Sequence, residues 1–139
     1  MAVHPAYLHS KLTNQIINIA RQVHAQRGPG DNEHAYRDDL VLALTAAGYW
    51  ACPKVRVAVR DANGQVTTFL SVDVTVNDCV AVELKALASS IHEEHLNQLS
   101  TWLRWNGILA VGLVLNFGSV VQVRRVFEPD CLDARPLKL

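Results

Sequence analysis

Two strand-like runs between residues 70 and 85 constrain the fold more than any other part of the chain. Side chains along a strand alternate between two faces. With this period, each run has one apolar face and one face that bears charge: Asp73 in the first run, and Glu83 and Lys85 in the second. Asn77-Asp78 separates the runs and is typical of a turn. The stretch therefore predicts two neighbouring strands whose polar faces carry two carboxylates and one amine.

The charged faces of these strands have two interpretations. On strands open to water, Glu83 and Lys85 would be ordinary solvated side chains, which is the common case. The chain also contains enough amphipathic helices to cover both sides of a sheet, and an unpartnered buried carboxylate is strongly unfavourable. Two carboxylates on neighbouring strands suit a hard divalent cation, which prefers oxygen ligands. Lys85 points to the same side, where an amine can hold an attacking water or offset phosphate charge.

Hydrophobic periodicity and turn residues give the order of the elements. Ser90-Ile91-His92-Glu93 is typical of a capping box that starts a helix, and Asn116-Phe117-Gly118-Ser119 is typical of a turn. A three-strand meander followed by a crossover helix and further strands predicts an α/β fold, with a mixed sheet flanked by helices on both faces. The expected helices cover residues 10–27, 31–47 and 90–106, and the expected strands cover residues 54–60, 70–76, 80–85, 108–115 and 120–126.

Composition limits the remaining classes. The 139 residues are 50% hydrophobic, which suits one domain over residues 1–139, with residues 1–9 as an N-terminal arm and 128–139 as a tail outside the core. Thirteen basic and thirteen acidic side chains cancel, so affinity for phosphate must come from a local basic patch plus bound metal. Cys52, Cys79 and Cys131 lack a CxxC pair and are expected to be reduced thiols. No apolar leader or membrane span is visible, and we expect a cytoplasmic protein.

Several motifs resemble one known group of proteins. Asp73 followed by Glu83-Leu84-Lys85 resembles the D…ExK signature of the PD-(D/E)XK nuclease superfamily. Gly30-x-x-Glu33-x-x-Tyr36, preceded by Gly28-Pro29, resembles the motif that names the GxxExxY family within that superfamily. The resemblance runs from about residue 12 to residue 126. Further landmarks that match the family in order are Val82-Glu83-Leu84-Lys85-Ala86, His92-Glu93, Leu115-Asn116-Phe117-Gly118 and Arg124-Arg125.

The resemblance implies a fold and a chemistry. The fold would be a restriction-endonuclease-like αβββαβ core, and the activity would be hydrolysis of phosphodiester bonds with Mg²⁺ or Mn²⁺, on DNA in preference to RNA. Asp73, Glu83 and the Leu84 backbone carbonyl would hold the metal. Glu33 would complete the acidic cluster through a water or a second ion, and Lys85 would orient the nucleophilic water.

One departure from the family pattern lies after His92-Glu93. Members of the family usually carry a glutamine there, and this chain has His95, which could substitute, as could Gln98 one turn further on. Tyr36, His92, His95 and Gln98 are therefore accessory candidates. An alternative function is an inactive nuclease-fold module that binds nucleic acid or protein, and a homodimer is left open. The candidates for contact with nucleic acid are Arg56, Arg104, Arg124 and Arg125.

A shared metal site also requires a particular hairpin register. A two-residue loop at Asn77-Asp78 would place Asp73 and Glu83 on opposite faces of the sheet. We therefore predict one extra residue in the connection, either a three-residue loop or a bulge nearby. With that register Asp73 opposes Glu83 and Ser71 opposes Lys85, while Glu33 reaches the same cluster from the second helix.

Overall fold

The structure is a computed structural model that describes residues 7–135. Within this range the helices and strands follow one another in the predicted order. The helices are α1 (Ser10–Arg27), α2 (Glu33–Ala46) and α3 (Glu93–Asn106). The strands are β1 (Ala51–Arg60), β2 (Val66–Val76), β3 (Val80–Lys85), β4 (Val111–Phe117) and β5 (Val121–Phe127).

The strands form one mixed sheet in the order β1-β2-β3-β4-β5. Strands β1, β2 and β3 form an antiparallel meander, and β4 and β5 form a second antiparallel pair. Strands β3 and β4 are parallel, so the chain between them must cross over, and α3 makes this crossover. The predicted α/β fold is confirmed, and it is consistent with a restriction-endonuclease-like architecture.

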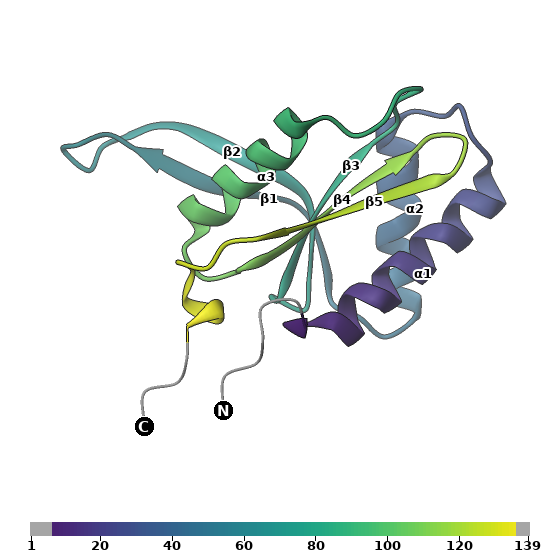
Figure 1. Cartoon of the computed structure of the whole chain (residues 1–139), viewed down its shortest axis with the longest axis horizontal. Coiled ribbons are helices and arrows are strands. Elements are labelled where there is room, and N and C mark those ends of the chain that lie inside the picture. The colour runs from purple at the N-terminus through teal and green to yellow at the C-terminus, as the bar shows by residue number, and fades with distance from the viewer. Residues whose placement is uncertain (1–6, 136–139) are drawn as a thin grey trace.

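The sheet is covered on both faces (Figure 1). Helices α1 and α2 pack against one face, where Ile16, Tyr36 and Leu40 meet the apolar side chains of β3 and β4. Helix α3 packs against the other face through Leu99 and Trp102. A Cβ atom at position 112 would lie 2.6 Å from the Leu99 Cδ2 atom, so glycine in β4 allows this close approach of α3. Strands β3 and β4 therefore lie between two apolar clusters.

The start of α3 differs from the predicted capping box. The helix begins at Glu93, and its N-cap is His92 rather than Ser90. The His92 backbone N–H donates a hydrogen bond to Nδ1 of His95 at 3.0 Å. An imidazole nitrogen thus satisfies an N–H group at the start of the helix, the role that a glutamate or glutamine usually fills.

The predicted turn at residues 116–119 is also wrong in part, because Asn116 and Phe117 are the last residues of β4. The Asn116 side chain accepts the Leu87 N–H at 2.7 Å and donates to the Ser89 carbonyl at 3.0 Å, so it holds the loop that leads into α3. Phe117 stacks on Tyr36 with 4.6 Å between the ring centroids. Asn116 and Phe117 are both buried, Asn116 with hydrogen-bond partners and Phe117 with an aromatic partner.

Residues 128–135, the part of the predicted tail that the structure describes, do not lie wholly outside the core. Cys131 is buried, and the Leu132 N–H donates to the Gly107 carbonyl at 2.9 Å. His9 Nε2 lies 2.5 Å from Asp133 Oδ2, so the two ends of the described chain are joined. The predicted arm at residues 1–9 and tail at residues 128–139 lie partly outside the described residues.

Two findings bear on the expected class of protein. The thiols of Cys52, Cys79 and Cys131 are free, as predicted. Between residues 7 and 135, no helix combines the length and the apolar character that crossing a membrane requires.

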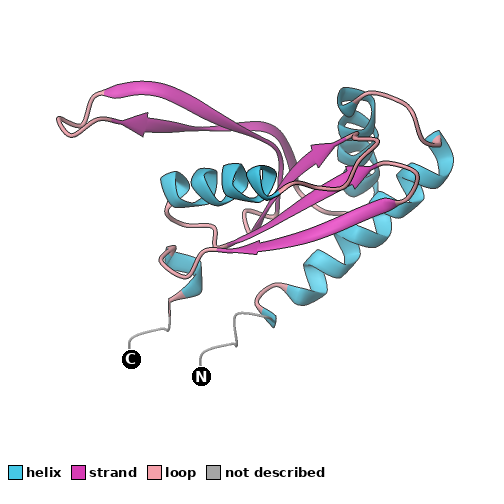
Figure 2. Ribbon diagram, turned by 45° about the horizontal axis from the view of Figure 1, so that its top comes forward, coloured by secondary structure: helices cyan, strands magenta, loops and turns pink. Residues whose placement is uncertain are grey.

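The outer parts of β1 and β2 extend past the end of α3, as Figure 2 shows. We call residues 55–72 the projecting hairpin. At its base, Lys54 adopts φ 53°, a left-handed conformation that is rare for a lysine in a strand. On β2, Val74 packs on the α1/α2 side of the sheet, whereas Val72 packs on the α3 side. The pair of strands therefore twists sharply at Lys54 and Asp73.

Candidate active site

The connection between β2 and β3 confirms the predicted register. Val76 pairs with Val80, which leaves the three-residue loop 77–79. Asn77 and Asp78 adopt left-handed conformations, and the Cys79 N–H donates to the Val76 carbonyl at 3.0 Å. Asparagine and aspartate tolerate this backbone conformation better than most residues. The loop thereby brings Asp73 into the same register position as Glu83.

Asp73 lies where β2 leaves β3. The β2–β3 ladder ends at the pair Val74–Val82, and Asp73 Oδ2 accepts the Leu84 backbone N–H at 2.8 Å. A side-chain oxygen thus satisfies a backbone group of β3 beyond the end of the ladder. Beyond this point Ser71 pairs with Arg56 of β1, so the predicted opposition of Ser71 and Lys85 is not part of the ladder. The sharp twist of β2 at Asp73 explains why Ser71 does not oppose Lys85.

Glu83 is half-buried beside Asp73. Burial raises the pKa of the Glu83 carboxyl to about 9, and a hydrogen bond to the Asp73 carboxyl and the charges of Asp73 and Glu33 act in the same direction. The charge of Lys85 lowers the pKa of Glu83 but does not cancel these effects. Two carboxylates this close cannot both be ionised without a counter-charge. The pair therefore either holds a proton or binds a cation.

Arg37 is a charged residue of the site that the sequence reading missed. It is only 8% exposed, and its Nη1 lies 3.8 Å from Asp73 Oδ1. Arg37 follows Glu33 by four residues, so both side chains lie on the same side of α2. In the sequence, the signal for Arg37 was its position one helical turn after Glu33 of the GxxExxY-like motif. In the structure, Arg37 supplies a positive charge next to the candidate ligand Asp73.

Glu33 lies in the first turn of α2 and is half-buried. Its charge contributes to the raised pKa of Glu83, so it lies within electrostatic reach of the carboxylate pair. However, residues 7–135 contain no group of three or more histidine, cysteine, aspartate or glutamate side chains close enough to hold a metal ion. A contact of Glu33 with a shared ion through water or a second ion, as the sequence predicts, stays a prediction. Asp73 and Glu83 form a pair, with Glu33 further away.

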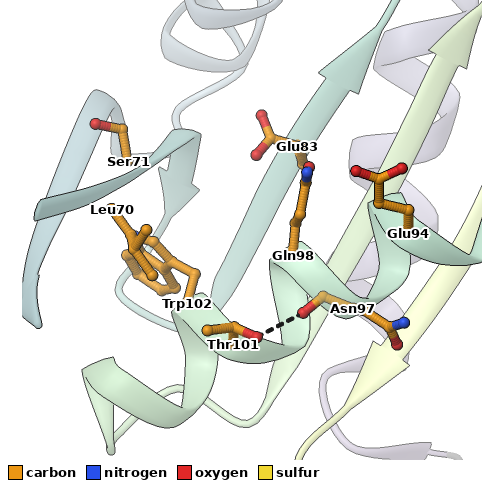
Figure 3. Close-up of a pocket in the computed structure, with 8 residues that line it drawn as sticks. All are labelled: Leu70, Ser71, Glu83, Glu94, Asn97, Gln98, Thr101 and Trp102. Atoms are coloured by element: carbon orange, nitrogen blue, oxygen red, sulfur yellow. Dashed lines mark hydrogen bonds between the residues drawn. The ribbon is translucent and has the colours of Figure 1, made fainter.

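A pocket of about 420 Å³ opens on the α3 side of Glu83. Figure 3 shows the Gln98 side chain extending from α3 toward the Glu83 carboxyl group. Leu70 and Trp102 form an apolar wall, and the Trp102 indole donates to the Val55 carbonyl at 3.2 Å. The pocket therefore offers space next to Glu83, and Gln98 is the accessory candidate that lines it.

The other accessory candidates have structural partners. The Tyr36 hydroxyl donates a hydrogen bond to the Gly28 carbonyl at 2.5 Å, so Tyr36 stabilises the loop between α1 and α2. His92 is exposed at the N-cap of α3. His95 is half-buried, and burial and the charges of Lys85 and His92 lower the pKa of its imidazole. His95 is the member of this group whose ring lies within electrostatic reach of Lys85.

The basic residues that the sequence suggested for contact with nucleic acid are not gathered in one patch. Arg56 lies on edge strand β1, and Arg124 lies on β5 at the opposite edge of the sheet. Arg104 on α3 pairs with Glu128 at 3.4 Å. Arg125 contacts the Leu8 carbonyl and the Thr13 hydroxyl, so it joins β5 to α1. Of the four, Arg56 is on the strand that runs beside β2, which carries Asp73.

Comparison with known proteins gives one match. A family model described as the PD-(D/E)XK nuclease superfamily matches residues 10–126 of the chain. The matched range contains α1 to β4 and all of β5 except its last residue. No curated protein and no solved structure matches the chain.

Proposed function

Because the chain belongs to the PD-(D/E)XK nuclease superfamily, we propose that it is a divalent-metal-dependent nuclease that cleaves phosphodiester bonds in nucleic acid. The observation that supports this proposal most strongly is the desolvated, hydrogen-bonded pair of Asp73 and Glu83. Membership of the GxxExxY family and a preference for DNA over RNA are further parts of the proposal.

The donor set fits Mg²⁺ or Mn²⁺. Asp73 and Glu83 offer carboxylate oxygens, which these hard cations prefer, and the pair lacks enough positive charge nearby to hold two negative charges. Asp73, Glu83 and the Leu84 carbonyl would bind the ion, and Glu33 would contact it through water. When bound, the ion supplies positive charge that activates a water molecule and stabilises charge on the phosphate.

The other residues act on the water and the phosphate. Lys85 is two residues beyond Glu83 on the same face of β3, where its amine can donate to the attacking water. Arg37 holds Asp73 in place and offsets part of its charge. Gln98 extends toward Glu83 from α3 and is placed to orient the substrate or the water. In this proposal the carboxylates, the amine and the amide act together where the β2–β3 ladder ends.

An inactive nucleic-acid-binding module is the second candidate. One observation favours it: the Nδ1 atom of His95, at the position where relatives carry a glutamine, accepts the His92 N–H as part of the helix cap. Because this nitrogen already accepts a hydrogen bond, it cannot donate one as the N–H group of a glutamine side chain can.

The test is incubation of the protein with labelled single- and double-stranded DNA and RNA, in Mg²⁺, Mn²⁺ or EDTA. Cleavage is expected with metal and absent in EDTA. Lys85→Ala should lower the cleavage rate by at least about a hundredfold, because it removes a donor to the reacting groups. The variant should keep the increase in melting temperature that millimolar Mn²⁺ causes. Asp73→Ala should lose both.

Arg21→Ala is a matched control, since Arg21 is an exposed charge on α1, which packs on the opposite face of the sheet from α3 and the pocket. It should cleave at a rate close to that of the wild type. If the wild type cleaves no nucleic acid but binds it, the inactive module is the better account. Equal cleavage by the wild type, Lys85→Ala and Asp73→Ala would show that the assigned site is wrong.

A further inference from the structure

The projecting hairpin has one covered face and one open face. Val55, Val57, Leu70 and Val72 pack against α3 on the covered face. Figure 3 shows Leu70 pointing at Trp102 and the Ser71 hydroxyl pointing away from Trp102, at the edge of the pocket. Because side chains alternate along a strand, the residues between them lie on the opposite face. This open face consists of Arg56, Arg60, Phe69 and Ser71, all of them exposed.

Two residues of the open face form a flat surface. The Arg56 guanidinium carbon lies 4.7 Å from the centroid of the Phe69 ring, and Phe69 is 51% exposed. An arginine in this position stabilises the ring by a cation–π interaction and fixes its orientation. Nucleic-acid bases that are not paired stack on aromatic rings and on arginine planes. We call these two residues the stacking platform.

The charge around the stacking platform matches a polyanion. Residues 54–72 contain three basic side chains, Lys54, Arg56 and Arg60, and one acidic side chain, Asp61, although the chain has no net charge. Asp61 Oδ1 accepts two backbone N–H groups of the hairpin turn, at 2.9 and 3.0 Å, and so serves the turn itself. The open face is therefore a local basic surface of the kind that attracts phosphates.

A second copy of the chain is a poorer fit to this edge of the sheet. Strand β1 is an edge strand, and unpaired edges can pair with another chain. However, β1 carries Pro53, Lys54, Arg56 and Arg60, and proline and exposed cations on an edge oppose such pairing. Charge and strand chemistry therefore favour nucleic acid over a protein partner.

The open face leads directly to the candidate active site. Phe69, Ser71 and Asp73 follow one another at every second position of β2. At about 3.3 Å per residue, Phe69 lies about 13 Å along the strand from Asp73. This is about two to four nucleotides of a single strand, which rises 3.4 Å or more per nucleotide. A strand bound at the site can therefore reach the stacking platform.

We propose that the open face of the projecting hairpin, together with Lys54 at its base, binds an unpaired segment of the nucleic-acid substrate, with one base on the Arg56–Phe69 stacking platform and phosphates at Lys54 and Arg60. The proposal rests on the nuclease function proposed above and adds the form of the substrate: single-stranded, or duplex with an unpaired flank. Paired bases cannot occupy the platform, because their faces are covered by the neighbouring base pairs.

The test measures binding of a fluorescent 12-nucleotide single strand, and of the same sequence as a duplex, by anisotropy in EDTA. Phe69→Ala should weaken single-strand binding by about fivefold to a hundredfold, the loss expected for one stacked base. Arg56→Lys keeps the charge but loses the planar group, and should also weaken it. Phe69→Trp should restore it. Duplex binding should change by less than about twofold, because it depends on phosphate contacts.

Leu42→Ala is the matched control, since Leu42 is also an exposed large apolar residue and lies on α2. It should bind like the wild type. Unchanged single-strand binding by Phe69→Ala and Arg56→Lys would overturn the proposal, as would equal losses for single strand and duplex. A wild-type dimer that Arg56→Lys and Phe69→Ala dissociate, without oligonucleotide binding, would show that the face binds a second copy instead.

The cleavage assay separates this proposal from the nuclease function. If the wild type cleaves and Phe69→Ala cleaves a single strand with unchanged KM, the proposal for the hairpin fails and the nuclease stands. If the wild type never cleaves but single-strand binding depends on Phe69, the nuclease fails and the binding face stands.

Discussion

Two regions of the sheet have different environments: strands β3 and β4, which we call the inner sheet, and the projecting hairpin. In β3 and β4, apolar side chains on both faces are buried beneath helices. In the projecting hairpin, only one face has a helix against it, and the open face carries charge and an exposed aromatic ring. The two regions meet at Lys54 and Asp73, where the strands twist.

The two regions contribute differently to the molecule: β3 and β4 stabilise the fold, and the projecting hairpin has groups available for contact with other molecules. Burial on both faces gives β3 and β4 the contacts that stabilise the fold, and leaves little room for a substrate. The hairpin contributes less to the core and keeps its polar and aromatic groups available. Asp73 lies at this boundary, and Glu83 lies beside it on β3, with a pocket on its α3 side. Three substitutions test this division, from the largest expected effect to the smallest.

The largest effect is expected in the inner sheet. Leu113 in β4 is 1% exposed, and Leu113→Ala should lower the free energy of unfolding by about 3 kcal/mol or more, since it leaves a cavity. Val66→Ala, at an exposed position of the projecting hairpin, should change it by less than about 0.5 kcal/mol. Urea denaturation measures both. Similar losses in the two variants would contradict the division.

An intermediate effect is expected at the boundary. Because the Glu83 pKa in the folded protein is about 9 and its ordinary value is 4.5, the folded state binds the proton more tightly than the unfolded state. Without metal, stability should therefore fall as pH rises from about 5 to about 9. The loss between pH 5 and 8 should be on the order of 2 kcal/mol, below the limit of about 1.4 kcal/mol per pH unit.

Glu83→Gln removes this titration and should flatten the dependence, as measured by urea denaturation in EDTA at several pH values. Glu94→Gln, a change at an exposed carboxylate that also lines the pocket, serves as the control and should leave the slope intact. An identical slope in Glu83→Gln and the wild type would mean that Glu83 is ionised in the folded protein at neutral pH.

The smallest effect is expected at the twist. Lys54 has φ 53°, and a non-glycine residue in this region is strained. Lys54→Gly should therefore raise the free energy of unfolding by about 0.5 kcal/mol, because glycine adopts this conformation without the steric cost. Thr68→Gly, at an ordinary strand position, should lower it by a similar amount. Thermal melts compare the two, and a loss of stability in Lys54→Gly would show that the lysine conformation is not strained.

The sequence predicted the fold and the connection between β2 and β3 because both depend on local patterns. Alternation in β2 and β3 placed Asp73 and Glu83 on polar faces, and the requirement that they meet predicted the three-residue connection, which the register confirms. The order of helices and strands followed from periodicity and turn residues in the same way.

The features that the sequence did not predict depend on contacts between distant segments. Arg37 meets Asp73 across 36 positions of the chain, so its place one turn after Glu33 in α2 does not by itself predict this contact. Asparagine is common in turns, and the sequence therefore predicted a turn at Asn116. In the structure its side-chain amide is buried and forms hydrogen bonds with the loop before α3. The fold of β2 away from β3 at Asp73 also left no signal, since the apolar alternation continues unbroken through the twist.

The contact between His9 and Asp133 has a consequence for how this chain could be rearranged. Residues 124 positions apart lie within hydrogen-bonding distance, so a short linker could connect the two ends of the described chain. New termini could then be opened in the exposed turn at residues 61–65. In such a circular permutant β1 and β2 would become the last and first strands of the chain, and the projecting hairpin would be held together by strand pairing alone.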